Sequence, residues 1–419
     1  MTFIPGETFI PASGQVVGAR EKEYMHTAVD NGWLTAGMFN AQFENMLGEY
    51  LGSTERLFSM QPPTIRTTNS GSSANLLAFS ALTSPTLGSR AIKPGDEVIT
   101  VACGFPTTIN PILQNGCVPV FLDINTTLNI DTAALEAAIT PKTRAIFIAH
   151  TLGNPFNLEE IMPLVERHNL WLIEDCCDAL GATWRGQKVG TFGHLATLSF
   201  FPAHHITMGE GGAVIINDRT LTRAVESFRD WGRDCWCSPG RDNTCGRRFD
   251  QQQGQLPCGY DHKYIFTHAG YNLKITEMQA ACGVAQLEQI DNFVQARRDN
   301  YNYLLKGLDK YAWSLLTPTI YPDADPSWFG FPILLNDVDF DRDTFVRYLN
   351  DNKIGTRLLF AGNVTKQPYM QGRNYRVVGG LSESDAVMNN LLWVGVQPAL
   401  TKEMLDYMIE KIDMFMGNF

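Results

Sequence analysis

Short apolar runs alternate with amphipathic segments through the middle of the chain. The apolar runs predict strands at Val98–Ala102, Val118–Asp123, Ala145–Ala149, Leu170–Glu174, Ala196–Phe201 and Ala213–Asn217. The amphipathic segments predict helices near Thr107–Gln114, Thr132–Ala138 and Leu158–Arg167. Short, continuously apolar strands between helices are typical of a largely parallel sheet that helices cover. The sequence therefore predicts an α/β fold.

The flanking parts of the chain carry fewer but longer periodic segments. We expect an irregular N-terminal segment over residues 1–30 and then a helix, because Phe39, Phe43 and Leu47 recur at helical spacing. A long helix is predicted from Thr276 to Asn302, and an amphipathic helix over Lys402–Phe415. We expect a large domain over residues 31–300 and a smaller α/β domain over residues 301–419.

One stretch, residues 229–268, interrupts this order. It is rich in Gly, Cys, Arg, Asp and Gln and shows no helical or strand period. Insertions of this length without secondary structure usually carry function or are disordered. We therefore treat it as a functional insertion in the large domain.

Composition narrows the class of protein. The 419 residues are 44% hydrophobic and 18% charged, as in an ordinary globular protein. No apolar run approaches the roughly 20 residues of a membrane span, and the N-terminus lacks the features of a secretory signal. The net charge of −11 argues against a nucleic-acid partner. We expect a cytoplasmic protein that binds neither membrane nor nucleic acid.

Candidate chemistry lies where the predicted strands end, since ligands of parallel sheets bind at the carboxyl ends of strands. This places Phe105, Asp123, His150, Asp175 and the turn at His204 among the candidates. For Asp175 the alternative is a helix cap or a solvated turn. The turn itself, in the stretch SFFPAHHITMGEGGAV, carries a glycine-rich hairpin that lets the backbone approach a ligand. We interpret the neighbouring His205 as structural.

A small-residue turn at Asn69 to Ser73 opens a predicted helix. Free N–H groups at a helix N-terminus favour an anion, so the turn is either a phosphate site or a plain N-cap.

Nine cysteines without a signal peptide do not indicate a disulfide framework. Four of them, Cys177, Cys235, Cys237 and Cys245, follow the pattern C-x57-C-x-C-x7-C. Four thiolates suit a 2Fe-2S cluster, and zinc also accepts four cysteines, although Cys-x-Cys is tighter than its usual spacing. From the residues alone, a cluster, a zinc site and unligated thiols all stay open.

Five motifs, in order, resemble the sugar aminotransferase/dehydratase family of the DegT/StrS type: GSSAN, ACGFPTT, IEDCCDALGA, SFFPAHHITMGEGGAV and GYNLKITEMQAA. The resemblance covers essentially the whole chain from about residue 30. It implies the aspartate-aminotransferase fold (pyridoxal-phosphate fold type I), with a mixed, mostly parallel sheet, helices on both faces and a smaller C-terminal α/β domain.

The resemblance also implies cofactor contacts, at Ser72, Ser73, Phe105, Asp175, Asp178, Ser199 and Asn272. The serines would bind the cofactor phosphate, Phe105 would stack on its ring and Asp175 would pair with the ring nitrogen. Asp178 stands where transaminating relatives have Gln or His. Asn272 would reach the phosphate in a neighbouring subunit, which implies a homodimer.

The departure from the family lies at His204. Aminotransferases carry their cofactor-binding lysine five residues after the serine that matches Ser199, and imidazole cannot replace it. The histidine-bearing subset resembles 3-dehydratases of nucleotide-linked 4-keto-6-deoxy sugars. These hold the cofactor as pyridoxamine 5'-phosphate, whose amine condenses with the C4 ketone. His204 would then abstract a proton from the cofactor methylene, and the C3 hydroxyl would leave as water.

With the resemblance, the cysteine pattern indicates the 2Fe-2S ligand set of the hexulose-3-dehydrases of 3,6-dideoxy sugar biosynthesis. That reading implies a flavin/iron-sulfur or ferredoxin-type reductase as a partner, and a nucleotide-diphosphate sugar as substrate. Three alternatives stay open: a cluster-free dehydratase that recycles its cofactor with glutamate, a sugar aminotransferase, and a non-catalytic iron-sulfur protein.

Overall fold

The computed structural model describes residues 3–52 and 62–418. Within these ranges the α-helices are α1 (Ala19–Asp30), α2 (Met38–Gly52), α3 (Gly71–Ala81), α4 (Pro106–Gln114), α5 (Leu135–Ala138), α6 (Leu158–Arg167), α7 (Thr222–Arg229), α8 (Glu277–Leu287), α9 (Ile290–Leu308), α10 (Arg342–Asp351), α11 (Ser382–Asn390) and α12 (Lys402–Met416).

The strands form three sheets. The largest contains β1 (Thr64–Thr68), β2 (Glu97–Val101), β3 (Val118–Leu122), β4 (Thr143–Ala149), β5 (Trp171–Asp175), β8 (Leu195–Ser199), β9 (Gly212–Ile216) and β14 (Arg376–Val377). The second contains β10 (Leu315–Leu316), β12 (Gly330–Leu335), β13 (Thr356–Arg357) and β15 (Leu391–Gly395), and the third β6 (Thr183–Trp184), β7 (Gln187–Lys188) and β11 (Ala324–Asp325).

The large sheet has the order β1-β9-β8-β5-β4-β2-β3-β14. Pairing is parallel from β8 across to β14 and antiparallel only where β9 meets β8 and β1. The predicted fold class, a mixed and mostly parallel sheet, is confirmed. Because parallel strands run the same way, their carboxyl ends gather at one edge.

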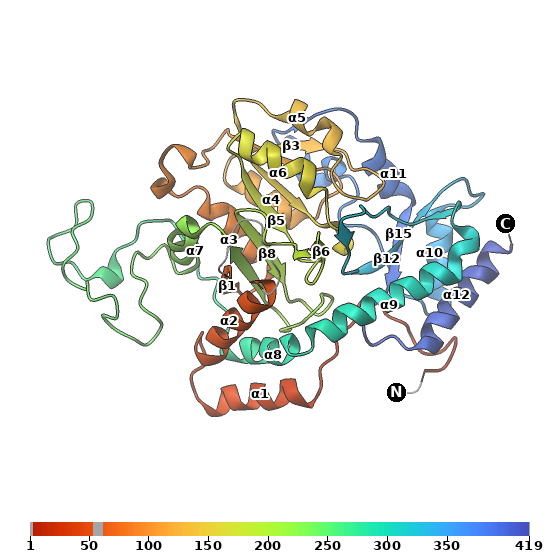
Figure 1. Cartoon of the computed structure of the whole chain (residues 1–419), viewed down its shortest axis with the longest axis horizontal. Helices are drawn as coiled ribbons and strands as arrows, with labels where there is room; N and C mark the ends of the chain where they lie inside the picture. Colours follow the sequence, from red (N-terminus) through yellow and green to blue (C-terminus); the bar gives the residue numbers. More distant parts are fainter. Residues whose placement is uncertain (1–2, 53–61, 419) are drawn as a thin grey trace.

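Helices cover both faces of this sheet (Figure 1). Alternate residues of β4 belong to different cores. Phe147 lies in a core that includes side chains of α3, α4 and α7, whereas Ile146 and Ile148 lie in one that includes side chains of α2, α6 and α8. Each strand is therefore buried on both sides, which is the reason that its sequence is apolar without alternation.

The C-terminal part of the chain builds a second core around the antiparallel β10-β12-β15-β13 sheet. Phe345 of α10, Ile412 of α12 and Ile10 from the N-terminal segment belong to that core. Helix α9 runs from the large sheet to this second layer (Figure 1). β14 returns to the edge of the large sheet, so the predicted boundary at residue 301 stays a prediction.

Two predictions about helices need correction. The N-terminal segment is not wholly irregular, since α1 forms and is anchored by Glu21, which is buried and accepts hydrogen bonds from Gln286 and Gln289. Because a polar residue anchors α1, the sequence of this helix carries no apolar period from which it could have been predicted. The long helix is two helices, because the backbone leaves helical geometry at Gln289 between α8 and α9.

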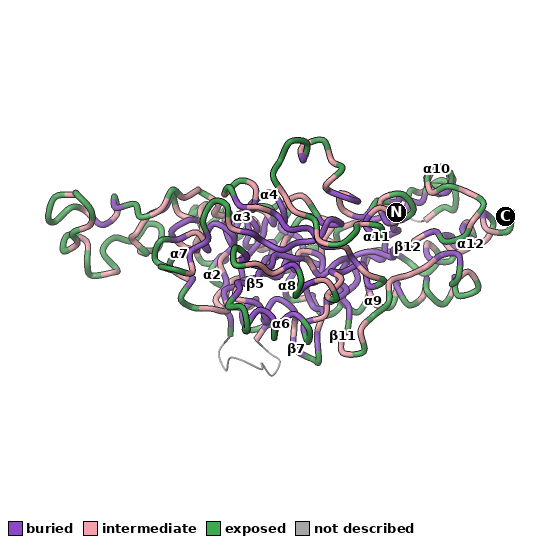
Figure 2. The backbone as a smooth tube through the Cα atoms, turned by 90° about the horizontal axis from the view of Figure 1, so that it is seen from above, coloured by how far each residue is buried: buried purple, intermediate pink, exposed green. Residues whose placement is uncertain are grey.

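The insertion, residues 229–268, has little regular structure, as predicted, with a single 3-10 turn at His262–Tyr264. It projects from the body of the molecule beyond α7, and most of it is exposed (Figures 1 and 2). Among the described residues, no helix is long and apolar enough to cross a membrane.

Candidate active site

A cavity of about 320 Å³ opens at the carboxyl ends of β5 and β8. We call it the central cavity. It is lined by Gly71, Ser72, Phe105, Thr107, Ala149, Leu152, Asp175, Cys177, Asp178, Ser199, Phe201, Ala203, His204, Phe329, Arg357, Leu358, Phe360 and Trp393. The structure thus brings together seven residues singled out in the sequence, from four separate motifs. Phe329, Phe360, Arg357 of β13 and Trp393 of β15 come from the C-terminal part of the chain, which sequence reasoning did not connect to the site.

The N-terminus of α3 forms one wall. Ser70 caps the helix, since its Oγ accepts from the Ser73 N–H (3.0 Å), while Gly71 and Ser72 face the cavity. Gly71 packs so closely on Ser199 that an added methyl carbon would lie 2.8 Å from the serine Oγ. Free N–H groups, the helix dipole and two serine hydroxyls suit a phosphate.

Asp175 ends β5 and is held as a hydrogen-bond acceptor. Its Oδ2 accepts from Asn75 Nδ2 (2.9 Å) and Thr108 Oγ1 (2.7 Å), and its Oδ1 accepts from the Cys177 N–H (3.1 Å). Thr197 Oγ1 in turn donates to Asn75 Oδ1 (2.6 Å). Such a network orients the carboxylate and keeps it suited to a cationic ring nitrogen. Asn75 and Thr108 lie within quoted motifs, yet their contact with Asp175 needs the fold.

His204 lies in the turn that leads from β8 toward β9. Its Nδ1 is buried without a hydrogen-bond partner among the described residues, and it lies 3.5 Å from Asp178 Oδ1. Burial, aided by the charge of Arg297, lowers the pKa of His204 to about 3, so the imidazole is neutral near neutral pH. His204 faces the cavity with its Nδ1 unpaired, and this position allows the ring nitrogen to take up a proton from a bound group.

Arg297 of α9 contacts this turn and is almost fully buried. Its Nη2 donates to the carbonyls of Ala203 (3.2 Å) and His204 (3.0 Å), and Nη1 donates to that of Phe329 (3.1 Å). Burial lowers the pKa of Arg297 to about 10, against the effect of Asp178. In the sequence, Arg297 is marked only as a charged residue on the apolar face of a helix, between Phe293 and Tyr301.

Glu174 and His150 form a structural pair away from the cavity lining. Glu174 Oε1 accepts from the N–H groups of Phe192 (2.9 Å) and Gly193 (2.7 Å), and its Oε2 lies 3.0 Å from His150 Nε2. Cys176 stands beside them, but burial raises the pKa of its thiol well above the usual value. This cluster is a hydrogen-bonded core rather than a metal site.

Two further candidates, Asp123 and Asn272, also lie elsewhere, and so does His205, which was interpreted as structural. Asp123 accepts from the first N–H groups of α11, at Glu383 (2.9 Å) and Ser384 (2.8 Å). His205 is buried, with Nε2 2.9 Å from the Ser327 carbonyl. Asn272 does not line the central cavity; its Oδ1 accepts from Lys274 Nζ (2.9 Å).

The central cavity fits a pyridoxal-type cofactor. The close Gly71–Ser199 contact at a helix N-terminus suits its phosphate, Asp175 suits its ring nitrogen, and Phe105 is 47% exposed beside them, free to cover a ring. Asp178 Oδ2 and His204 Nδ1 are buried polar atoms without partners among the described residues. A bound polar group at this place would satisfy them.

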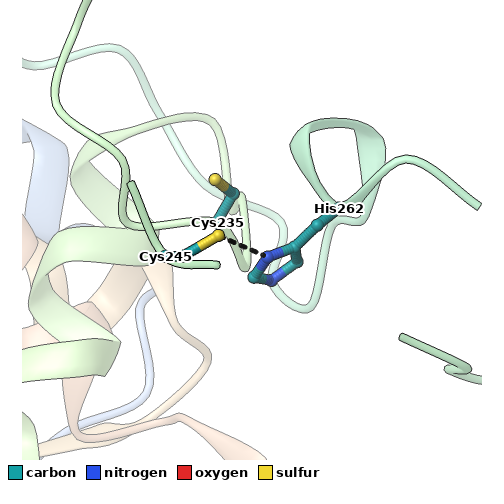
Figure 3. A group of neighbouring side chains, drawn as sticks. All are labelled: Cys235, Cys245 and His262. Atoms are coloured by element: carbon teal, nitrogen blue, oxygen red, sulfur yellow. Dashed lines mark hydrogen bonds between the residues drawn. The ribbon is translucent and has the colours of Figure 1, made fainter. Parts of the chain in front are cut away.

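The four cysteines of the spacing pattern do not converge within one chain. Cys177 lines the central cavity, whereas Cys235, Cys245 and His262 lie in the insertion, with one donor atom of each within 4.8 Å of the others (Figure 3). Cys237 belongs with them. Burial acts to raise its pKa, but hydrogen bonds from Thr244, Cys245 and Cys235 bring it down to about 6.

His262 was not anticipated from the sequence. It is fully buried, its Nδ1 is 3.7 Å from Cys245 Sγ and its Nε2 is 2.6 Å from Asp234 Oδ2. Nothing in the spacing of a loop without periodicity marks a single histidine as part of a thiol group.

Comparison with known proteins gives a consistent picture. The model of the DegT/DnrJ/EryC1/StrS aminotransferase family matches residues 15–413. The chain is similar to the lipopolysaccharide biosynthesis protein RfbH of Salmonella typhimurium, with 57% identity over 100% of this chain and 94% of that protein. It is 49% identical to the dTDP-4-dehydro-2,6-dideoxy-D-glucose 3-dehydratase of Saccharopolyspora spinosa, over 100% of this chain and 88% of that enzyme.

Among solved structures, the GDP-4-keto-6-deoxy-D-mannose-3-dehydratase of E. coli with bound hydrated pyridoxal phosphate superposes with a TM-score of 0.84. It is 27% identical and matches 97% of this chain and 100% of that one.

Proposed function

The chain belongs to the DegT/DnrJ/EryC1/StrS aminotransferase family, and on this basis we propose that it removes the C3 hydroxyl of a nucleotide-diphosphate 4-keto-6-deoxyhexose. The single observation that carries the proposal is the position of His204, whose unpaired Nδ1 lies in a cavity that no lysine lines within the described residues. Two relatives named above are 3-dehydratases, which supports the same reaction class.

The cofactor of this proposal is pyridoxamine 5'-phosphate, or pyridoxal 5'-phosphate in its aldehyde form. When bound, it supplies the amine that joins the C4 ketone and a ring that accepts electrons. The N-terminus of α3 with Ser72, Ser73 and Ser199 would bind the phosphate. Asp175 would hold the proton of the ring nitrogen, and Phe105 would cover one ring face.

His204 moves the proton in this proposal. Its Nδ1 is unpaired at the cavity, so the imidazole can take a proton from carbon at this atom. That proton can be held at Nδ1, 3.5 Å from Asp178 Oδ1, and then given to the departing C3 hydroxyl, which leaves as water. Arg297 fixes the position of the turn through the His204 carbonyl.

We further propose that the active protein is a homodimer, that it binds a 2Fe-2S cluster and that a flavin/iron-sulfur or ferredoxin-type reductase delivers electrons to it. The spacing of Cys177, Cys235, Cys237 and Cys245 supports the cluster, as does the convergence of the last three in the insertion. The separate position of Cys177 does not fit a four-cysteine site within one chain. The separation favours a second candidate, a cluster-free dehydratase.

The test is turnover by the anaerobically purified protein with pyridoxamine phosphate, a defined reductant with a flavin/iron-sulfur or ferredoxin-type reductase, and a panel of CDP-, dTDP- and GDP-4-keto-6-deoxyhexoses. Mass spectrometry and NMR should show loss of the C3 oxygen for one class of nucleotide. Formation of a 4-amino sugar in the presence of glutamate, with C3 unchanged, would contradict the proposal.

Iron and sulfide assays on the same preparation decide between the two candidates. Cys235→Ser should lose the iron, whereas Cys258→Ser, at an exposed cysteine of the same insertion, should keep it. A wild-type protein without iron that still dehydrates the sugar would establish the cluster-free enzyme.

A further inference from the structure

Donor atoms of the kind that bind metals converge inside the insertion, within one chain. Sγ of Cys235, Sγ of Cys245 and a ring nitrogen of His262 all lie within 4.8 Å of one another (Figure 3). Cys237 joins them, since its thiol forms hydrogen bonds with those of Cys235 and Cys245. The group therefore offers three sulfur donors and one nitrogen donor. Four donors are what a tetrahedral ion or a 2Fe-2S cluster requires.

The distance between two of these atoms already suits a metal. Cys245 Sγ lies 3.7 Å from His262 Nδ1. Metal–sulfur and metal–nitrogen bonds of about 2.3 and 2.1 Å at a tetrahedral angle place the two donors about 3.6 Å apart. A metal bound to both atoms therefore needs little movement of either. Its binding would displace the proton of each thiol, which is released to solvent.

His262 is held as a metal-binding histidine is. Its Nε2 lies 2.6 Å from Asp234 Oδ2, and Gln253 Nε2 donates to the same oxygen (2.9 Å). Because a carboxylate only accepts, Nε2 carries the proton and Nδ1 keeps its lone pair toward Cys245. Histidine ligands usually have such a carboxylate behind them, which fixes the tautomer and the orientation of the ring. Trp236 also packs edge-on against this imidazole, with ring centroids 5.5 Å apart.

The insertion has no hydrophobic core of its own to hold it together. All of residues 229–268 are described, and the buried ones are Gly232, His262 and Ile265, so only one apolar side chain is buried. Segments that cannot build a core usually need a disulfide or a metal. The three thiols of the group are free in the described structure. A disulfide between two of them would leave the third thiol and the buried imidazole without a role.

We propose that the insertion alone holds a metal centre, that its ligands are Cys235, Cys237, Cys245 and His262, and that Cys177 is not a ligand. Where the centre is a 2Fe-2S cluster, the inference rests on the proposed function and deepens it, because it names His262 Nδ1 as the fourth ligand. A single zinc ion fits the same four donors, and metal analysis distinguishes the two.

Metal analysis of anaerobically purified wild type and variants tests this ligand set. We expect wild type to contain either iron with an equal amount of sulfide or one zinc ion per chain. His262→Gln should lower the bound metal at least about tenfold, whereas Cys177→Ser should keep it. Cys258→Ser, at an exposed cysteine of the same insertion, is the matched control and should also keep it.

A second variant separates a ligand from a residue that only supports the fold. His262→Cys supplies a thiolate in place of the imidazole, so it should keep the metal and lose the nitrogen signature. For a cluster, that signature is nitrogen hyperfine coupling in pulsed EPR of the reduced protein, and the midpoint potential should also fall, since histidine ligands raise it. For zinc, Co²⁺ added to the metal-free protein should change from the absorption of a three-sulfur, one-nitrogen site to that of a four-sulfur site.

Metal that is lost in Cys177→Ser but kept in His262→Gln would overturn the inference and leave the proposed cluster standing. An iron-sulfur signal from wild type without nitrogen coupling would do the same. Zinc in place of iron, lost in His262→Gln, would support the ligand set and contradict the proposed cluster. Wild-type protein without bound metal would contradict both.

Discussion

Oδ1 of Asp178 lies 3.5 Å from Nδ1 of His204 in the lining of the central cavity, and both side chains are largely buried. Burial, with the charge of Asp175 adding to it, raises the pKa of Asp178 to about 8. Near neutral pH the pair is therefore a protonated carboxyl beside a neutral imidazole. This arrangement gives the imidazole a polar neighbour without charging it in advance.

Substitution of Asp178 should reveal what that neighbour does. Asp178→Leu leaves Nδ1 without a polar neighbour, and we expect kcat for dehydration to fall about 10²-fold. Asp178→Asn keeps the shape and the neutral charge, and we expect it to retain activity within about tenfold. Steady-state kinetics with the cofactor saturated checks both variants. Equal, severe loss in the two would mean that the negative charge itself is required.

Substitution of Gly71 tests the proposed phosphate-binding site at the N-terminus of α3. In Gly71→Ala the added methyl carbon would lie 2.8 Å from Ser199 Oγ, so the serine must move away from the proposed phosphate position. We expect the Kd for pyridoxal phosphate, measured by fluorescence titration, to rise at least about tenfold. Gly380→Ala, where nothing lies within 4 Å of the added carbon, is the control. Unchanged affinity in Gly71→Ala would place the phosphate elsewhere.

Substitution of Glu174 tests whether this carboxylate is structural, in contrast to the adjacent Asp175, which lines the central cavity. Glu174 is fully buried and its oxygens accept from three backbone N–H groups, including that of Gly190 (2.9 Å). Glu174→Gln cannot satisfy all of them, so we expect the free energy of unfolding to fall by about 2–4 kcal/mol in urea titration. Glu166→Gln on the exposed side of α6 should cost less than about 0.5 kcal/mol. Equal stability of the two variants would show that Glu174 is not structural.

The pH dependence of stability tests His194. Burial, then the charge of Arg90, lowers its pKa to about 4, and its Nδ1 accepts from the Leu172 N–H (3.1 Å). Below about pH 6.5 the unfolded chain binds a proton that the folded chain does not, so stability falls as pH drops toward 4. This one group should cost about 2–3 kcal/mol over that window.

His194→Asn keeps an acceptor at the same place but cannot titrate. Urea midpoints measured between pH 7 and pH 4.5 should therefore fall less steeply in this variant than in wild type. The same substitution at His26, which is exposed on α1, should leave the slope unchanged. A parallel slope for His194→Asn and wild type would contradict the assignment.

The sequence predicted the sheet and part of the cavity at its edge because apolar runs and small-residue turns are local signals. Asp175, Ser199 and His204 end or follow such runs, so the parallel topology alone brings them together. Arg297 could not be placed in this way, because it lies on a helix that is far along the chain from the turn that it contacts. The same holds for Phe329 and for Arg357 of β13, which reach the cavity only through tertiary packing.

The cysteine pattern shows most clearly what could not be predicted from the sequence. Spacing suggested one four-thiol site, but it says nothing about which thiols share a surface. The fold places Cys177 at the central cavity and Cys235, Cys237 and Cys245 in the insertion, a separation that the spacing does not reveal.

The central claim is that His204 acts as the base of a dehydration in the place where aminotransferases hold a lysine. The direct measurement is the reaction of the His204→Lys variant with cofactor and the nucleotide 4-keto-6-deoxyhexose that wild type accepts. Borohydride should trap the cofactor on the introduced lysine, which shows a folded site, while loss of the C3 oxygen falls to background. Dehydration by that variant at the wild-type rate would contradict the account.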